Sequence, residues 1–184
     1  MISQRARDSL DQMLMLGIQA SVAGAAAQTC EISVLDNAAD IQESKVVVLT
    51  AASYLFRLLV LIYFSPDAST KSHFARINNI HHSDRTEQTF LDAIRECGNI
   101  CCGSLNRELV RVVPHVAMST PNIIERQCAH YLESLNGGHL QHFRALTDEG
   151  QRLHFSLCVR PYAPVDFEWT AEPAAANAGE MEFF

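Results

Sequence analysis

The sequence predicts one mixed α/β domain that combines helices with antiparallel pairs of strands. Three stretches carry this prediction. Residues 84–113 repeat apolar side chains with the spacing of one long amphipathic helix. Residues 46–64 hold two runs with the composition of buried strands, and residues 139–160 alternate as a hairpin. The chain has 184 residues, of which 48% are apolar, and this is enough to bury a sizeable core.

The first part of the chain is expected to hold one helix and two short strands. Apolar spacing predicts a helix from residue 3 to about residue 16, and Gly17 should end it. Looser alternation predicts strands over residues 18–23 and 29–35. The polar stretch 36–44 should connect them to the apolar segment that follows.

Two apolar segments raise the question of export or membrane insertion. Two arginines precede the apolar run 13–27, but two aspartates interrupt the basic part, so we expect no signal peptide. Residues 46–64 carry a single charge, Arg57, and approach the length of a membrane span. Because residues 46–49 and 58–64 have the composition of strands and are separated by the small residues 51–53, we predict two buried strands paired as a hairpin instead.

Two helices should follow. Residues 65–67, Ser-Pro-Asp, predict a helix start in which the serine is the cap. In the next, long helix, Asp84 and Glu87 are a candidate capping pair. A proline disfavours helix at the residue before it, so this helix should stop near Val112. Its length would be roughly 27 residues, or about 40 Å.

The last third is expected to be mostly extended. Residues 116–118 should be a short strand and 123–135 a short helix, while 139–147 and 152–160 should pair across the turn 148–150. One side of the second hairpin strand carries mostly polar side chains, Arg152, His154, Ser156 and Cys158. This side should be exposed to solvent or covered by a partner. The Pro-, Ala- and Glu-rich residues 161–184 predict a loosely attached tail after a domain of residues 1–160.

Composition limits the possible functions. The net charge of −7, without a cluster of Lys and Arg, argues against a nucleic-acid partner. Six cysteines without a secretory segment indicate a reducing, cytoplasmic location. Cys97, Cys101 and Cys102 share the long helix and are interpreted as core fillers. A small thiol or metal protein that uses these three cysteines is an alternative class of function. His81 and His82 have no matching ligand pair in the sequence, so no metal site is predicted.

The long helix has two contrasting faces when successive residues are placed 100° apart. One is an apolar stripe of Leu91, Ile94, Gly98, Cys101, Leu105 and Leu109. The opposite face carries Asp92, Glu96, Asn99, Gly103 and Arg107. Such a face is usually only solvated. Glu96 and Asn99 are three residues apart, however, so their side chains emerge together, and Gly103 leaves room for a partner to approach.

The Glu-x-x-Asn pattern occurs twice in the sequence. The second copy, Glu133 to Asn136, is followed directly by two glycines and is typical of a helix end or turn, so we interpret it as structural. The first copy lies in mid-helix, opposite the apolar stripe, and is therefore the candidate site.

These features resemble a known family. The helix pattern, the downstream Ser-Thr-Pro and the order of elements are similar to the CheC/CheX/FliY family of response-regulator phosphatases, closest to the single-motif CheX type. The similarity covers roughly residues 10–160. In that family a small acidic or hydroxyl residue, a glutamate and an asparagine share an exposed helix, and a proline follows some twenty-odd residues later. The corresponding residues here are Asp92, Glu96, Asn99 and Pro121.

The resemblance implies both a fold and a function. It implies a mostly antiparallel sheet with long helices on one face, and a homodimer. The substrate would be the phospho-aspartate of a CheY-like response regulator. Asn99 would hold the attacking water, Glu96 would pair with the regulator's lysine, and Asp92, Gly103 and Arg107 would contact the regulator. Mg²⁺ would be bound by the regulator, so this protein would need no cofactor of its own.

The residue types agree with that chemistry. An amide neither gives up nor accepts a proton at useful pH, so a Glu–Asn pair is a poor acid–base catalyst. It can, however, orient a water toward an acyl phosphate that is already activated elsewhere. The strongest alternative is a non-catalytic domain of the same type that binds a response regulator or a signalling scaffold.

Overall fold

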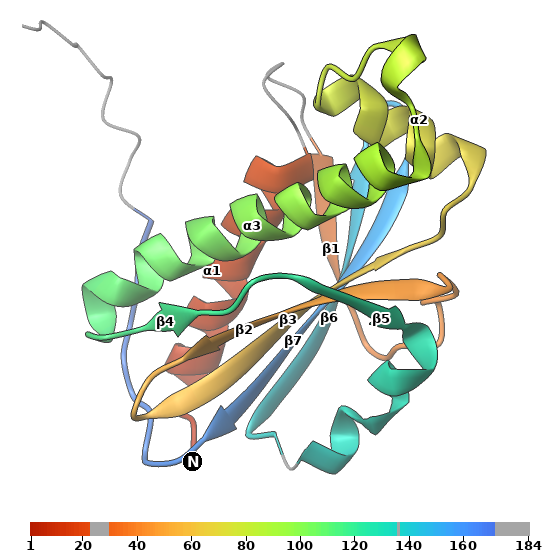
Figure 1. The fold of residues 1–184 in the computed structure, drawn as a ribbon. Helices are drawn as coiled ribbons and strands as arrows, with labels where there is room; N and C mark the ends of the chain where they lie inside the picture. The colour runs from red at the N-terminus through yellow and green to blue at the C-terminus, as the bar shows by residue number, and fades with distance from the viewer. Residues whose placement is uncertain (23–29, 136, 172–184) are drawn as a thin grey trace, which may run out of the picture.

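A computed structural model describes residues 1–22, 30–135 and 137–171 of the chain. In chain order its elements are α1 (Gln4–Val22), β1 (Cys30–Leu35), β2 (Lys45–Ala52), β3 (Phe56–Phe64), α2 (Ala68–Ile77), the 3-10 helix η1 (His82–Asp84), α3 (Glu87–Val112), β4 (Ala117–Met118), β5 (Asn122–Glu125), the 3-10 helices η2 (Arg126–Tyr131) and η3 (Glu133–Leu135), β6 (His139–Thr147) and β7 (Arg152–Pro161). Helices α1 and α3 lie side by side across one face of a single sheet (Figure 1).

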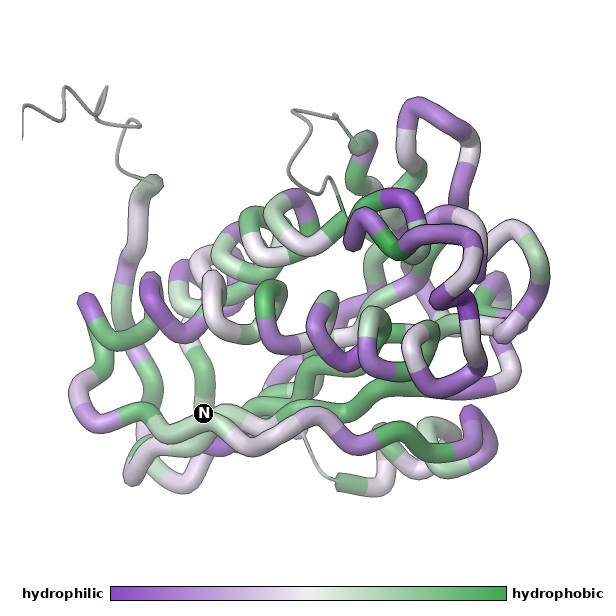
Figure 2. Tube along the Cα trace, turned by 45° about the horizontal axis from the view of Figure 1, so that its top comes forward, coloured by the Kyte–Doolittle hydropathy of each residue, from purple (hydrophilic) through white to green (hydrophobic). Residues whose placement is uncertain are grey.

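The sheet is antiparallel at every pairing of its named strands. Their order is β1-β6-β7-β3-β2, and the outer edge of β2 is shared by β4 and β5. The two predicted hairpins are confirmed, since β2 pairs with β3 and β6 pairs with β7. The strands that run beneath the helices are largely hydrophobic (Figure 2). The predicted mixed α/β fold, with a mostly antiparallel sheet and long helices on one face, is therefore confirmed.

Both faces of the sheet are covered. The larger core lies between the sheet and α1 and α3, and Phe56, Phe143 and Phe155 are fully buried in it. A smaller apolar cluster on the opposite face includes Ile41 and Leu132, and these residues belong to the chain's own connection before β2 and to the segment after η2. The polar side of β7 is therefore covered by the chain itself. Accordingly, His154, Ser156 and Cys158 are buried, while Arg152 at the strand's start is exposed.

Helix α1 does not end at Gly17 as predicted. It continues to Val22, so the strand predicted over residues 18–23 is wrong where the structure describes it. A Cβ atom on Gly17 would lie 2.5 Å from the backbone oxygen of Cys101 in α3. The glycine is therefore needed for the close approach of two helices, and this packing outweighs its poor helix propensity.

The starts of α2 and α3 differ from the prediction. Asp67, not Ser65, caps α2, because its carboxylate accepts the N–H of Thr70 at 2.8 Å. Thr86 caps α3 in a reciprocal capping box with Thr89, so the helix begins at Glu87 and the predicted Asp84–Glu87 capping pair is wrong. The predicted stop near Val112 is confirmed. Serine, threonine and aspartate cap almost equally well, so sequence alone did not choose among neighbouring candidates.

The segment after α3 is more extended than predicted. Residues 123–135 were expected to be a short helix, but Asn122–Glu125 form β5 and only the rest is 3-10 helix. Ile123 pairs with Val47 and Ile124 with Val46. Two β-branched residues next to an open strand edge pair with it in preference to starting a helix.

The segment expected to be a loose tail is described as far as residue 171. Val165 and Trp169 are buried, and the Trp169 indole donates to Glu108 Oε2 on α3 at 3.0 Å. Arg5 on α1 pairs with Asp166, and this hydrogen bond lowers the pKa of Asp166 to about 2. Residues up to Trp169 thus pack against α1 and α3. The domain limits of 1–160 with a tail to 184 stay a prediction.

None of the helices in the described ranges combines the length and the apolarity that crossing a bilayer requires. Residues 46–64, the segment of near-spanning length, form the buried β2–β3 hairpin instead.

Three cysteines of α3 are buried between α1, α3 and the sheet. Burial raises the pKa of Cys97 to about 12 and that of Cys102 to about 11, and raises the pKa of Cys101 as well. These thiols therefore stay protonated at physiological pH, as their interpretation as core fillers predicts. Within residues 1–22, 30–135 and 137–171, no three His, Cys, Asp or Glu side chains gather in a way that could hold a metal ion.

The buried thiols should make the protein less stable at alkaline pH. Their pKa values in the folded state lie above the ordinary value near 9, so the stability they contribute is complete below pH 9 and is lost as pH rises toward 11 to 12. Urea unfolding at pH 8 and pH 10 checks this. The loss at pH 10 should shrink in the Cys97→Ala/Cys102→Ala double variant; an equal loss in both proteins would contradict it.

Candidate functional site

The candidate site lies on the exposed side of α3. Glu96 and Asn99 are both exposed, and the Asn99 amide Nδ2 donates to Glu96 Oε2 at 3.1 Å. One turn earlier, Asp92 accepts from Gln88 at 2.9 Å and pairs with Arg95 at 2.9 Å. Arg107 is exposed further along the helix. The predicted separation of this face from the apolar stripe is confirmed.

The site points outward because the other side of α3 is packed. Ile94, Cys101 and Leu105 are fully buried, as the 100° spacing predicts. Gly98 lies between Glu96 and Asn99 and faces the sheet, where an added Cβ would be 2.9 Å from Leu49 Cδ1. The absence of a side chain at this position brings α3 close to β2, and so holds the helix that carries the site firmly in place.

Pro121 is brought next to the same turn of α3. An added Cβ on Gly98 would lie 3.8 Å from Pro121 Cβ. The loop is fixed on the edge of β2, since the Thr50 N–H donates to Ser119 Oγ at 3.0 Å and the Ser119 N–H donates to the Thr50 oxygen at 2.9 Å. In Figure 1 the segment from β4 to β5 runs beside the middle turns of α3. The structure thus joins two parts of the chain that the sequence could relate only through the resemblance.

Gly103 leaves an open place on the helix beyond Asn99. No atom lies within 4 Å of where its Cβ would be. By contrast, Glu108, one turn further, is held by Arg111 at 2.8 Å and by Trp169. The exposed positions between Asp92 and Arg107 are therefore accessible, and the far end of this stretch borders the docked segment that carries Trp169.

Apolar residues around the site were not predicted. Ile100 follows Asn99 and is 41% exposed, and Met118, on the short strand before Pro121, is 37% exposed. Ile100 belongs neither to the apolar stripe of the helix nor to its opposite face. Its place outside the apolar stripe was the only sign in the sequence that it would be exposed. Exposed apolar side chains beside a polar pair are typical of a surface that binds another protein.

The second Glu-x-x-Asn copy has a different setting. Glu133 starts the three-residue 3-10 helix η3, and Asn136 lies outside the described residues. This copy is therefore not in the middle of a long helix.

The candidate pair has distinctive electrostatics. Among the described residues the Glu96 carboxylate has no cationic partner, whereas Asp92 has one. The Asn99 oxygen and the second N–H of its amide stay available to solvent or to a partner. The arrangement offers one carboxylate to a cation and one amide to a water, and the amide itself transfers no proton.

No protein-family model matches the sequence, and no curated protein matches it significantly. Among solved structures, the chemotaxis protein CheX from Vibrio vulnificus superposes with a TM-score of 0.61 at 12% identity, over 82% of this chain and 99% of that one. The chain has a CheX-type fold. The resemblance predicted from the sequence is thereby confirmed at the level of the fold.

Two further structures with the CheX-type fold extend the comparison. The CheX-CheY-BeF3-Mg²⁺ complex from Borrelia burgdorferi matches with a TM-score of 0.57 at 11% identity, covering 83% of this chain and 96% of that one. A CheC-like superfamily protein from a Shewanella species matches with a TM-score of 0.57 at 8% identity, covering 83% and 97%. The fold thus extends over nearly the whole length of each of these proteins.

Proposed function

We propose that this protein removes phosphate from the phospho-aspartate of a CheY-like response regulator. The observation that carries the proposal is the exposed, hydrogen-bonded Glu96–Asn99 pair in the middle of α3, beside Pro121, within a CheX-type fold. The Borrelia burgdorferi structure of this fold contains CheX together with CheY, BeF3 and Mg²⁺. A phosphorylated regulator of the CheY type is therefore the proposed partner.

Asn99 would position the attacking water. Its Nδ2 donates one hydrogen bond to Glu96, which holds the amide in place and leaves the Oδ1 atom outward. Oδ1 can accept a hydrogen bond from a water and so orient that water in line with the phosphoryl group. An acyl phosphate needs little further chemical activation, so positioning the water supplies most of the catalysis.

Glu96 would orient the complex. Its carboxylate is exposed and has no cation beside it among the described residues, so it is ready to pair with the regulator's lysine. The Mg²⁺ ion would be held by the regulator, and the protein would contribute no metal ligand. Asp92, Gly103 and Arg107 would contact the regulator along the same side of α3, and Ile100 would add apolar contact beside Asn99.

The direct test is phosphate release from phosphorylated receiver domains. Purified receivers from the same genome are phosphorylated with a small phosphodonor, and their loss of phosphate is followed with and without this protein. Faster loss for at least one receiver is expected. Binding of a phosphorylated receiver without faster loss would favour the non-catalytic alternative, and no effect on any receiver would contradict the proposal.

Charge reversal at Glu96 should weaken both binding and hydrolysis. In Glu96→Lys the proposed contact brings two cations together, so we expect a drop in affinity of roughly tenfold or more, with a matching drop in kcat/KM. Titration of the phosphorylated receiver gives the affinity, and phosphate release gives the rate.

A matched control is Glu31→Lys. Glu31 is exposed on β1, at the opposite edge of the sheet from β4 and β5, so the net charge changes equally without touching α3. This control should bind like the unmodified protein. Equal weakening in both variants would show a general charge effect and remove Glu96 from the interface.

A further inference from the structure

A hollow lies on the face of the sheet opposite α3. It has a volume of about 270 Å³ and is bounded by the connection before β2, by η2, and by strands β3 and β6. Its location follows from the register, because Tyr63 belongs to the smaller apolar cluster while its neighbours Ile62 and Phe64 belong to the main core. The hollow is thus separated from the Glu96–Asn99 pair by the sheet itself.

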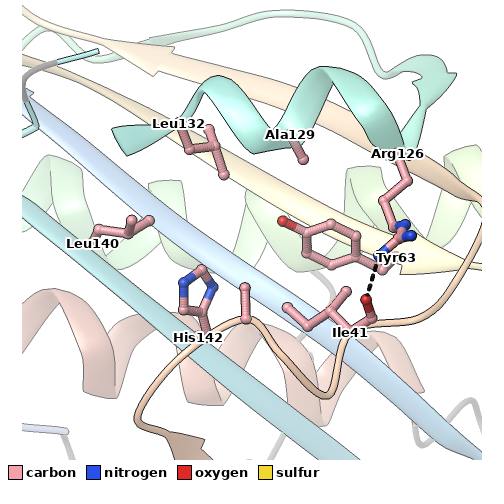
Figure 3. A pocket seen from close by; sticks show the side chains of 8 residues that line it. Ile41, Tyr63, Arg126, Ala129, Leu132, Leu140 and His142 are labelled. Carbon is pink, nitrogen blue, oxygen red and sulfur yellow. Dashed lines mark hydrogen bonds between the residues drawn. The ribbon is translucent and has the colours of Figure 1, made fainter. Parts of the chain in front are cut away.

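Most of the wall is apolar. Ile41 is 2% exposed and Leu132 is 7% exposed, and they approach the hollow from opposite sides, as Figure 3 shows. Leu140, Ala129 and Ala38 complete the apolar part. By comparison with a cavity of about 150 Å³ that holds the six carbons of benzene, this volume has room for about eleven non-hydrogen atoms. A ligand with one small ring or a branched chain is therefore the right size.

A chain of hydrogen bonds ends at the hollow. Ser156 is fully buried and donates its single hydroxyl proton to the Tyr63 oxygen at 3.1 Å. Its oxygen must therefore accept from His142 Nδ1, which lies 2.6 Å away. The Tyr63 O–H has no acceptor among the described residues, although Tyr63 is only 3% exposed, and its hydroxyl points into the hollow in Figure 3. Burial raises the pKa of Tyr63, so it remains a donor at neutral pH.

A guanidinium faces the same space. Arg126 donates from Nη1 to the Ile41 backbone oxygen at 2.7 Å, drawn as the dashed line in Figure 3. The other N–H groups of the guanidinium have no protein acceptor among the described residues. Glu43, which is partly buried, is bonded through Oε1 to His154 Nδ1 at 2.6 Å, and its charge helps to raise the pKa of Tyr63. Asp36 and Asp40 lie exposed on the connection before β2. Arg126 is therefore fixed at the rim with donors still to be satisfied.

We propose that this pocket binds a small organic carboxylate whose apolar body fills the space between Ile41, Leu132 and Leu140. The carboxylate would accept hydrogen bonds from the Arg126 guanidinium and from the Tyr63 hydroxyl. Both groups are donors to the pocket, and a charged acceptor makes the stronger hydrogen bond with each of them. This proposal concerns the opposite face of the sheet and does not depend on the phosphatase proposal.

Phenylacetate, with ten non-hydrogen atoms, is a suitable probe, together with benzoate and 4-methylpentanoate. The methyl resonances of Ile41, Leu132 and Leu140 are followed by NMR during titration of the full chain. A ligand of this size should bind with a dissociation constant of about 1 mM. Phenylacetamide has the same shape without the charge, so it should bind at least tenfold more weakly.

Three variants locate the site. Tyr63→Phe and Arg126→Gln should each weaken phenylacetate binding roughly tenfold, and Arg126→Gln should also remove the preference for the acid over the amide. Ala129→Phe fills the pocket and should abolish binding. Arg160→Gln, at an exposed position of β7, removes the same charge and should bind like the unmodified chain. Unchanged resonances of Leu105 in the other core show that each variant is folded.

Two results would overturn the proposal. One is the absence of any shift at the three reporter methyls with all three carboxylates at 20 mM. The other is binding that persists in Ala129→Phe, because the ligand would then occupy a different place.

Discussion

Replacing Asn99 with alanine should lower the rate of phospho-aspartate hydrolysis by roughly 10²-fold or more, the scale expected when a positioning group is lost. The fold should survive, because Asn99 is exposed, its side chain contacts only Glu96 among the hydrogen bonds described, and alanine favours helix. Binding should be largely kept, since Glu96 and the surrounding face of α3 remain. Single-turnover phosphate release with saturating protein separates the rate from the affinity.

Asn99→Asp gives the matched comparison. It preserves the shape of the side chain but places a negative charge beside Glu96 and beside the phosphoryl group. It should therefore be no more active than Asn99→Ala. Full activity in Asn99→Ala would rule out the proposed role of the amide. Activity restored by aspartate would point to proton transfer, and not to positioning, as the task of this residue.

The second large effect is expected on the buried side of α3, at Gly17. A Cβ at this position would lie 2.5 Å from the backbone oxygen of Cys101, which cannot move unless α3 moves with it. Gly17→Ala should therefore destabilise the protein by about 2 kcal/mol or more. This cost lies in the upper part of the range for overpacking. It exceeds the gain of about 1 kcal/mol that alanine contributes because it favours helix more than glycine does. Urea unfolding at neutral pH measures it.

Gly103→Ala is the control for Gly17→Ala. It makes the same chemical change inside a helix, but no atom lies within 4 Å of the new methyl group. It should leave stability unchanged or raise it by up to about 1 kcal/mol. If both variants behaved alike, the close contact of α1 with α3 would not be what Gly17 provides.

The parts of the fold that were predictable are those set by local periodicity. The two hairpins and the end of α3 near Val112 followed from alternation and from the proline after the helix. The end of α1 did not, because Gly17 acts as a contact with Cys101, and this contact is visible only once both helices are placed. Ile123 likewise became a strand residue only because β2 offered it an open edge.

The candidate site divides in the same way. Glu96 and Asn99 could be singled out because they share a turn opposite a buried stripe. The approach of Pro121 could not be derived from spacing, since it depends on Ser119 bonding to Thr50 and on the missing side chain of Gly98. The pocket on the other face could not be predicted from the sequence at all, because its polar groups come from separate elements that only the tertiary fold brings together.

The outer edge of β2 has a consequence for how copies of the chain can associate. Two short strands, β4 with two residues and β5 with four, cover that edge, and Pro121 between them has no N–H to offer. Such a broken edge is a poor template for a strand from another molecule, which protects it from aggregation. Of the described strands, β1 is outermost on the other side. Two copies that joined their sheets would therefore meet along β1 and leave both Glu96–Asn99 pairs accessible.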